Sequence, residues 1–92
     1  MVDREFHYGV TRRLRVLRRQ VGANIHACRL SKNVSLEKLS QRSGLSVALI
    51  DRLEMGGGEV ELRQIISLAF ALHISVDELL SGAGTGQRAS IA

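Results

Sequence analysis

Apolar side chains recur every three or four residues from about residue 11 onward, the spacing at which a helix presents one face. This stripe predicts one long helix over residues 11–31, and it consists of Leu14, Leu17, Val21, Ile25 and Cys28. Gly22 lies within it and weakens a helix by roughly 1 kcal/mol relative to Ala without ending it. Residues 1–10 show no clear periodicity, so the predicted helix begins after them.

Residues 35–54 predict two short helices joined by a tight turn. Ser35 is placed to cap the first helix, Leu36 and Leu39 give that helix an apolar side, and Gly44 ends it. Ser46 is placed to cap the second helix. The two segments have the layout of a helix-turn-helix.

The second short helix has one edge for a core and one free edge. Its apolar residues at helical spacing are Leu49, Ile50 and Leu53. The residues left to point elsewhere are Val47, Asp51 and Arg52. A helix of this kind can be laid in a groove of a partner.

The C-terminal half predicts two more helices and no strand. The glycines at positions 56–58 are expected to end the preceding helix and keep the next loop flexible. Residues 61–73 are the most apolar segment and predict the central helix, Ser75 caps a last short helix, and residues 82–92 are expected to be mobile. The predicted core is Leu39, Leu45, Ile50, Leu53, Ile65, Leu68, Ala69, Leu72 and Leu79.

Length and composition indicate one small domain inside the cell. The 92 residues allow one modest core, and their 45% apolar content includes no run of about 18 residues that would cross a membrane. Charges at Asp3, Arg4 and Glu5 fall where a secretory signal needs an apolar region, so we expect a cytoplasmic protein with no membrane partner. Cys28 is the only cysteine, which rules out an intrachain disulfide and favours a buried thiol.

The net charge of +4 conceals an asymmetry. Residues 1–46 hold ten Lys or Arg against three acids, a charge of +7, whereas residues 47–92 hold three against six, a charge of −3. The basic residues of the first half are dense enough for contact with a polyanion, although a solvated helix face or dimer pairing would also use them. They include Arg12, Arg13, Arg15, Arg18, Arg19, Arg29, Lys32, Lys38 and Arg42.

No residues form a recognisable catalytic or metal site. His7, His26 and His73 are scattered without ligand spacing, and the single thiol has no evident acid–base partner. The triple glycine lacks the Lys-Ser or Lys-Thr of a phosphate-binding loop. We therefore expect a protein that is not an enzyme and has no cofactor.

Several motifs within about residues 21–80 resemble the helix-turn-helix domain of the phage repressor and Cro type, also called the xenobiotic-response-element family. They are Leu39-Ser40 with Gly44-Leu45-Ser46, Ile50-Asp51-Arg52-Leu53-Glu54-Met55-Gly56, Leu68-Ala69-Phe70-Ala71-Leu72 and Ile74-Ser75-Val76-Asp77-Glu78-Leu79-Leu80. The resemblance implies an all-α, five-helix, lambda-repressor-like DNA-binding domain over residues 19–81. It leaves residues 1–18 as an N-terminal basic helical extension and residues 82–92 as a tail.

The resemblance also implies roles for individual residues. It places the base-reading face at Ser46, Val47, Ala48, Leu49 and Arg52, with Leu36 beside it. It further implies that Arg29 and Glu54 pair to join the first helix to the end of the recognition helix; the alternative is that Arg29 contacts phosphate directly. Free amides after Ser35 and Ser46, together with Arg42, Ser43 and Gly57 in the glycine loop, are the candidates for contact with the DNA backbone.

The chain departs from the family where bases are read. Many members place glutamine at the Leu36 position and polar residues at positions 47–49, whereas this chain has Leu36 and Val47-Ala48-Leu49. Such side chains contact thymine methyl groups but offer little hydrogen-bond discrimination, which leaves Arg52 as the candidate for a guanine contact. Glu59 and Glu61 also place negative charge where relatives often carry lysine or arginine. Both features favour modest specificity and weaker binding.

Two functions follow as hypotheses. The first is a DNA-binding transcriptional regulator, a repressor that binds an operator as a homodimer. The second is an antitoxin-like or adaptor module that holds a protein partner through the apolar edge at positions 47–49 or through the arginine-rich helix. For the extension, we predict that the stripe of Leu14, Leu17 and Val21 pairs with the same stripe of a second chain; the alternative is that this helix folds back on its own domain.

Overall fold

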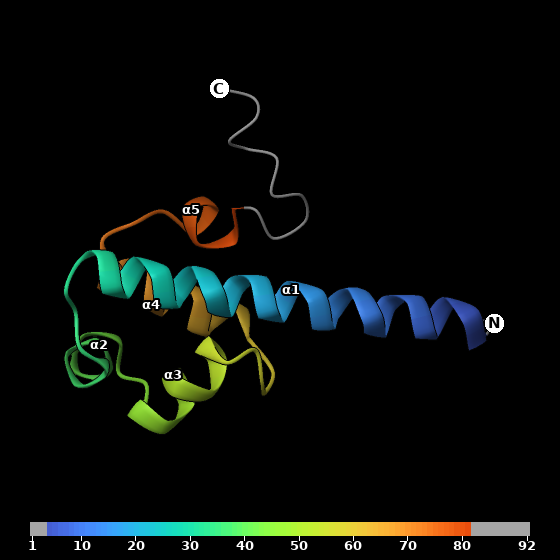
Figure 1. Ribbon diagram of the computed structural model, residues 1–92, viewed down its shortest axis with the longest axis horizontal. Helices are drawn as coiled ribbons and strands as arrows, with labels where there is room; N and C mark the ends of the chain where they lie inside the picture. Colours follow the sequence, from blue (N-terminus) through green and yellow to red (C-terminus); the bar gives the residue numbers. More distant parts are fainter. Residues whose placement is uncertain (1–3, 82–92) are drawn as a thin grey trace.

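The computed structural model describes residues 4–81, with side chains from residue 9 onward. These residues form five helices and no strand: α1 Arg4–Ser31, α2 Leu36–Ser43, α3 Val47–Glu54, α4 Leu62–Leu72 and α5 Val76–Leu80. Helix α1 runs the length of the molecule, with α2 and α3 on one side of it and α5 on the other (Figure 1). The predicted all-α, five-helix fold is confirmed. The expected mobility of residues 82–92 concerns residues outside the described part of the chain.

Helix α1 begins at Arg4, seven residues before the predicted start. The prediction was wrong because apolar periodicity marks only the part of a helix that packs against a core. The first turns of α1 extend past the other helices (Figure 1), and their sequence shows no such periodicity. Since α1 runs unbroken through residues 18 and 19, the proposed boundary between extension and domain is not a boundary between elements. Helix α1 runs straight past the other helices and does not turn back toward them (Figure 1), although Leu14 and Leu17 line a hollow with residues of its own domain.

Seven of the nine predicted core residues are buried: Leu39, Ile50, Leu53, Leu68, Ala69, Leu72 and Leu79. Leu45 and Ile65 are only half-buried and pack against that core from its edge. The first helix contributes Val21 and Ile25, whereas Cys28 is half-buried and not fully enclosed as expected. The core therefore lies between α1 and the four shorter helices.

Gly22 sets the distance between α1 and α3. A Cβ at this position would collide with the backbone carbonyl oxygen of Leu53, so any larger residue would push the two helices apart. This close approach lets the middle of α1 support the C-terminal turn of α3.

The helix caps follow the predicted serines. The Ser35, Ser46 and Ser75 hydroxyl oxygens accept backbone N–H groups at the starts of α2, α3 and α5. Helix α3 ends in a Schellman motif, with Gly56 at φ 82°, its N–H donating to Leu53 and the Gly57 N–H donating to Arg52. The glycine loop expected to be flexible thus begins as an ordered helix cap.

Candidate nucleic-acid interface

Hydrogen bonds fix the turn between α2 and α3. The Ser40 hydroxyl donates to the Leu45 carbonyl oxygen at 2.6 Å, and the Leu45 N–H donates to Ser43 Oγ at 3.1 Å. The Gly44 N–H also donates to the Ser40 carbonyl oxygen, which closes the end of α2. Ser43, predicted to contact the DNA backbone, therefore already holds the turn, although its hydroxyl hydrogen is still available to a phosphate.

Helix α3 presents one exposed face with helical spacing. Ala48, Asp51, Arg52 and Met55 are all exposed at positions i, i+3, i+4 and i+7. Of the predicted base readers, Ala48 and Arg52 lie on this face, and Ser46 is exposed at the start of the helix.

The predicted apolar edge of α3 is mostly turned inward. Leu49 packs against the core and Val47 is half-buried. Leu36 of α2 likewise packs against the core, so it has less surface for a base than predicted. The resemblance assigned these three side chains to the interface, whereas helical spacing had placed Leu36 and Leu49 on the apolar sides of their helices, where the structure has them.

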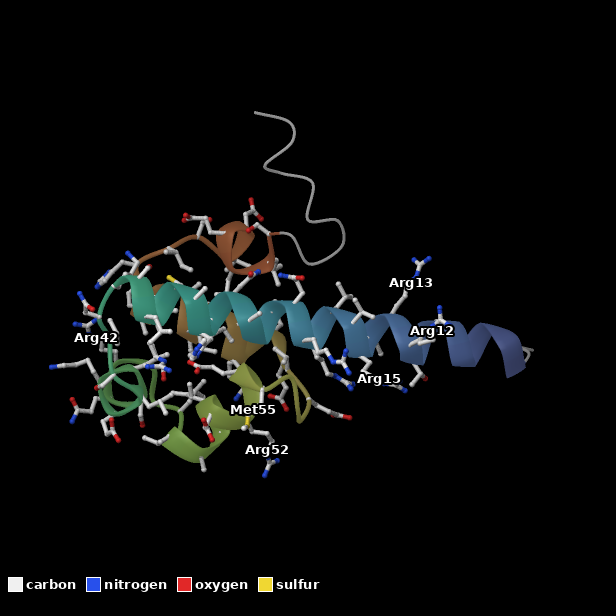
Figure 2. All side chains as sticks on the ribbon, in the orientation of Figure 1. Arg12, Arg13, Arg15, Arg42, Arg52 and Met55 are labelled. Atoms are coloured by element: carbon white, nitrogen blue, oxygen red, sulfur yellow. The ribbon has the colours of Figure 1, made fainter. Side chains whose placement is uncertain are left out.

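Arg52 lies at the end of α3, beside the glycine loop and close to Met55 (Figure 2). Its alkyl chain packs so closely on this loop that a Cβ at Gly57 would lie 3.2 Å from Arg52 Cγ and one at Gly58 3.0 Å from Arg52 Cδ. Because Gly57 and Gly58 have no side chains, the alkyl chain of Arg52 can pack on the loop while its guanidinium group extends beyond it. Gly57, predicted as a backbone contact, is half-buried beneath that stem.

A second basic surface surrounds the start of α2. Ser35, Lys38 and Arg42 line a hollow of about 390 Å³ together with Lys32 and His73. Arg42 points away from the rest of the fold at the end of α2 (Figure 2). Two of the predicted backbone-contact residues, Ser35 and Arg42, are thus brought together, and they lie on a surface separate from Arg52.

Arg29 and Glu54 form the predicted link between α1 and α3. Arg29 Nε donates to Glu54 Oε2 at 2.7 Å and Nη2 donates to Glu54 Oε1 at 3.0 Å, in a forked geometry. Arg29 Nη1 also donates to the Val34 carbonyl oxygen at 3.0 Å. With 11% and 5% of their side chains exposed, the two residues are enclosed, which argues against Arg29 as a phosphate contact.

Glu54 is held ionised by its partners. Burial alone would raise the pKa of its carboxyl group, but the hydrogen bonds from Arg29 and His26 outweigh that effect and lower the pKa. His26 Nδ1 lies 2.8 Å from Glu54 Oε1, a contact the sequence did not predict. It follows from helical spacing, since positions 26 and 29 share a face of α1.

Met55 was not predicted to belong to the site, and Asp51, Lys32 and Lys38 were noted only as a free-edge residue and as members of the basic set, without an assigned contact. A helical wheel of α3 places Asp51 and Met55 beside Arg52, so that signal was present in the sequence. The grouping of Lys32 with Lys38 depends on how the end of α1 meets the start of α2, which periodicity does not determine.

Within the described part of the chain, no cluster of three or more histidine, cysteine or acidic side chains is positioned to hold a metal ion. Burial raises the pKa of the Cys28 thiol, and the charge of Lys32 only partly offsets this, so the thiol is protonated at neutral pH. Among residues 4–81, no helix has the length and apolar character needed to cross a membrane.

Comparison with known proteins identifies the family to which this fold belongs. The model of the Cro/C1-type helix-turn-helix family matches residues 25–79. The structure is similar to that of the restriction-modification controller protein C.AhdI from Aeromonas hydrophila, with 34% identity, a TM-score of 0.66, and coverage of 67% of this chain and 94% of that one. No curated protein matches the chain.

The clp gene regulator ClgR from Corynebacterium glutamicum is also similar. It has 33% identity and a TM-score of 0.70, and the match covers 83% of this chain and 94% of that one. A second ClgR structure gives 31% identity and a TM-score of 0.72, with coverage of 82% of this chain and 80% of that one. Because the family match extends over more than half of the chain, the chain belongs to the Cro/C1-type helix-turn-helix family of DNA-binding transcriptional regulators.

Proposed function

We propose that this regulator is a repressor that binds an operator as a homodimer, with the exposed face of α3 in the major groove. One observation carries the proposal: Ala48, Asp51, Arg52 and Met55 form an exposed helical face whose orientation is supported by the Arg29–Glu54 link. A recognition helix needs such a face to meet base edges. Two structural neighbours, C.AhdI and ClgR, are named as a controller protein and a gene regulator, which supports a role in control of transcription.

Each group of candidate residues has a separate task in this proposal. Arg52 donates to guanine, and Ala48 and Met55 contact thymine methyl groups. Ser46, Val47 and the exposed parts of Leu36 and Leu49 contribute to the fit in the groove. Ser35, Arg42, Ser43 and Gly57 contact phosphates, as do the amides at the start of α2.

Negative charge limits the strength of binding. Asp51 is exposed beside Arg52, and Glu59 and Glu61 follow on the loop and at the start of α4. A carboxylate near phosphate is unfavourable, although Asp51 can accept from a cytosine amino group. We therefore infer modest affinity and a salt-sensitive interaction that depends on a few direct base contacts.

We further infer that the protein is not an enzyme, since its family members act by binding DNA. A DNA-binding regulator acts where the chromosome lies, and for this chain we infer the cytoplasm. The antitoxin-like or adaptor role has weaker support. Its apolar edge is reduced because Leu49 packs inward and Val47 is half-buried.

Substitutions at Arg52 and Arg42 test the proposal, because these two arginines lie on separate surfaces and are assigned different contacts. Arg52→Ala should weaken binding to the preferred duplex by about 1–3 kcal/mol and leave binding to a random duplex nearly unchanged. Arg42→Ala should weaken both by similar factors. Titrations of each variant against both duplexes, at one fixed salt concentration, provide the measurement.

Equal losses on the two duplexes for Arg52→Ala would show that Arg52 contacts the backbone and reads no base. A wild-type protein that bound neither duplex, or whose affinity did not fall with added salt, would contradict the proposed function.

A further inference from the structure

The N-terminal half of α1 carries an apolar ridge that its own domain leaves open. Val10, Leu14 and Leu17 are 42%, 44% and 38% exposed, whereas Val21 on the same stripe is 5% exposed. The stripe thus leaves the core as α1 extends beyond the other helices (Figure 1). The match to the family begins only at residue 25, so the family does not account for this ridge.

An apolar groove lies directly beside the ridge. Its volume is about 580 Å³, and it runs between α1 and the segment that leads into α4, with the end of α5 closing one side. The lining residues are Leu14, Leu17, Arg18, Val21, Glu59, Val60, Ile65 and Leu80. Because Leu14 and Leu17 of the ridge also form one wall of the groove, the ridge and groove make one continuous apolar surface that can face a copy of itself, as a two-fold symmetric interface requires.

Charge decides how a second copy is placed. Arg13 and Arg15 are exposed around the ridge, so two ridges facing only each other would bring like charges together. Glu59 lines the groove and Glu61 is exposed close by in the sequence. The groove carries Arg18 as well as Glu59, so a ridge that enters the groove of another copy gains an opposite charge only where one of its arginines meets Glu59.

We propose that the N-terminal half of α1 from one copy seats in the groove of a second copy, with the two α1 helices antiparallel and the exchange reciprocal. This inference rests on the proposed homodimer and names its interface. Arg15 lies on the α3 side of α1, the side from which the glycine loop leads to Glu59 (Figure 2). In this arrangement Arg15 of one copy pairs with Glu59 of the other, because Arg15 is exposed beside the ridge and Glu59 lines the groove that the ridge enters.

A rival surface lies on α4. Leu62, Ile66 and Phe70 are 67%, 49% and 79% exposed and form a stripe at intervals of four residues. None of them lines the groove beside α1. The ridge and groove are favoured because they supply both halves of a complementary interface and opposite charges at its edge.

Sedimentation of the full chain tests the interface with two matched variants. Leu14→Glu places a carboxylate on the ridge, and Phe70→Glu makes the same change on α4; both positions are exposed, so neither disturbs the core. Leu14→Glu should raise the dimer dissociation constant at least tenfold, whereas Phe70→Glu should leave it within a factor of two. Circular dichroism checks that both variants keep their helices.

A charge exchange provides the second arm. Glu59→Arg and Arg15→Glu should each weaken self-association, but an equimolar mixture should form heterodimers, because both contacts across that pair are then oppositely charged. Loss of dimerisation in Phe70→Glu but not in Leu14→Glu would overturn the proposal. So would an equimolar mixture of Glu59→Arg and Arg15→Glu that associates no more strongly than either variant alone. A wild-type chain that stays monomeric at all concentrations would also overturn it. Titration of each variant against a random duplex distinguishes a wrong interface from a wrong function. A variant that no longer dimerises should still bind the random duplex weakly, since a single domain still contacts phosphate.

Discussion

Gly22 allows α1 to lie against the end of α3, and this outweighs its poor helix propensity. Gly22→Ala should destabilise the protein by about 2 kcal/mol, although Ala favours a helix by roughly 1 kcal/mol, because the new Cβ collides with the Leu53 carbonyl oxygen. Gly9→Ala is the matched control on the same helix, since its Cβ meets nothing within 4 Å. Urea unfolding of both variants checks this. Equal stabilisation by both would show that the two helices are not in close contact.

The link between Arg29 and Glu54 should be measurable as coupling. Each single change to Ala should cost about 3 kcal/mol because it leaves a buried charge without its partner. The double variant should lose less than the sum of the two single changes, by about 1–3 kcal/mol. Additive losses in the double-mutant cycle would contradict the link.

The same pair predicts the response of the protein to acid. Since the pKa of Glu54 is lower in the folded protein than its usual 4.5, its contribution to stability is complete above that pH. It is lost as the pH falls below about 4.5 through the folded pKa. Unfolding free energies between neutral pH and pH 3 should fall less steeply for Glu54→Gln than for the wild type. Parallel curves would exclude this contribution.

At the scale of single elements, the serine caps and the tight turn are local and could be predicted from the sequence, because Ser35, Ser46 and Ser75 each precede an apolar periodic segment. The start of α1 could not be predicted from the sequence, because its first turns extend past the other helices and their sequence shows no apolar periodicity. The packing of Leu49 against the core agrees with its helical spacing with Ile50 and Leu53, and it was only the resemblance that placed Leu49 at the DNA.

Two substitutions at Ser46 distinguish its role as the cap of α3 from its proposed role at the DNA. Ser46→Ala should cost about 1 kcal/mol of stability because Leu49 N–H loses its acceptor, which lies 3.1 Å away. Ser46→Asp should keep the cap and the stability but weaken DNA binding, since it places a carboxylate at the interface. Thermal melts and duplex titrations of both variants measure the two effects. Unchanged DNA affinity in Ser46→Asp would place the start of α3 away from the phosphates.

For the whole molecule, the packing of five short helices around one core was predictable because most buried positions follow helical periodicity. The basic hollow was not predictable, because it joins Lys38 and Arg42 of α2 to His73, which directly follows α4 and is far away in the sequence. The same holds for the groove beside α1, which α1, the segment before α4 and α5 build together.

Leu68 tests the single-core arrangement. Its side chain is fully buried in α4, so Leu68→Ala should reduce the free energy of unfolding by about 2–5 kcal/mol. Phe70→Ala on the same helix is the control, because Phe70 is 79% exposed and should change stability by less than about 0.5 kcal/mol. Denaturant melts that gave similar losses for both would contradict the assigned core.

Selection of bound sequences from a random duplex pool tests both base recognition by α3 and dimer symmetry, because sequence-specific binding by a symmetric dimer enriches a repeated site. A dimer that reads bases through α3 should enrich an inverted repeat with two half-sites about one helical turn apart and a guanine in each for Arg52. A pool that remained random after repeated rounds would contradict sequence-specific recognition through α3, and a single unrepeated site would contradict the symmetric dimer.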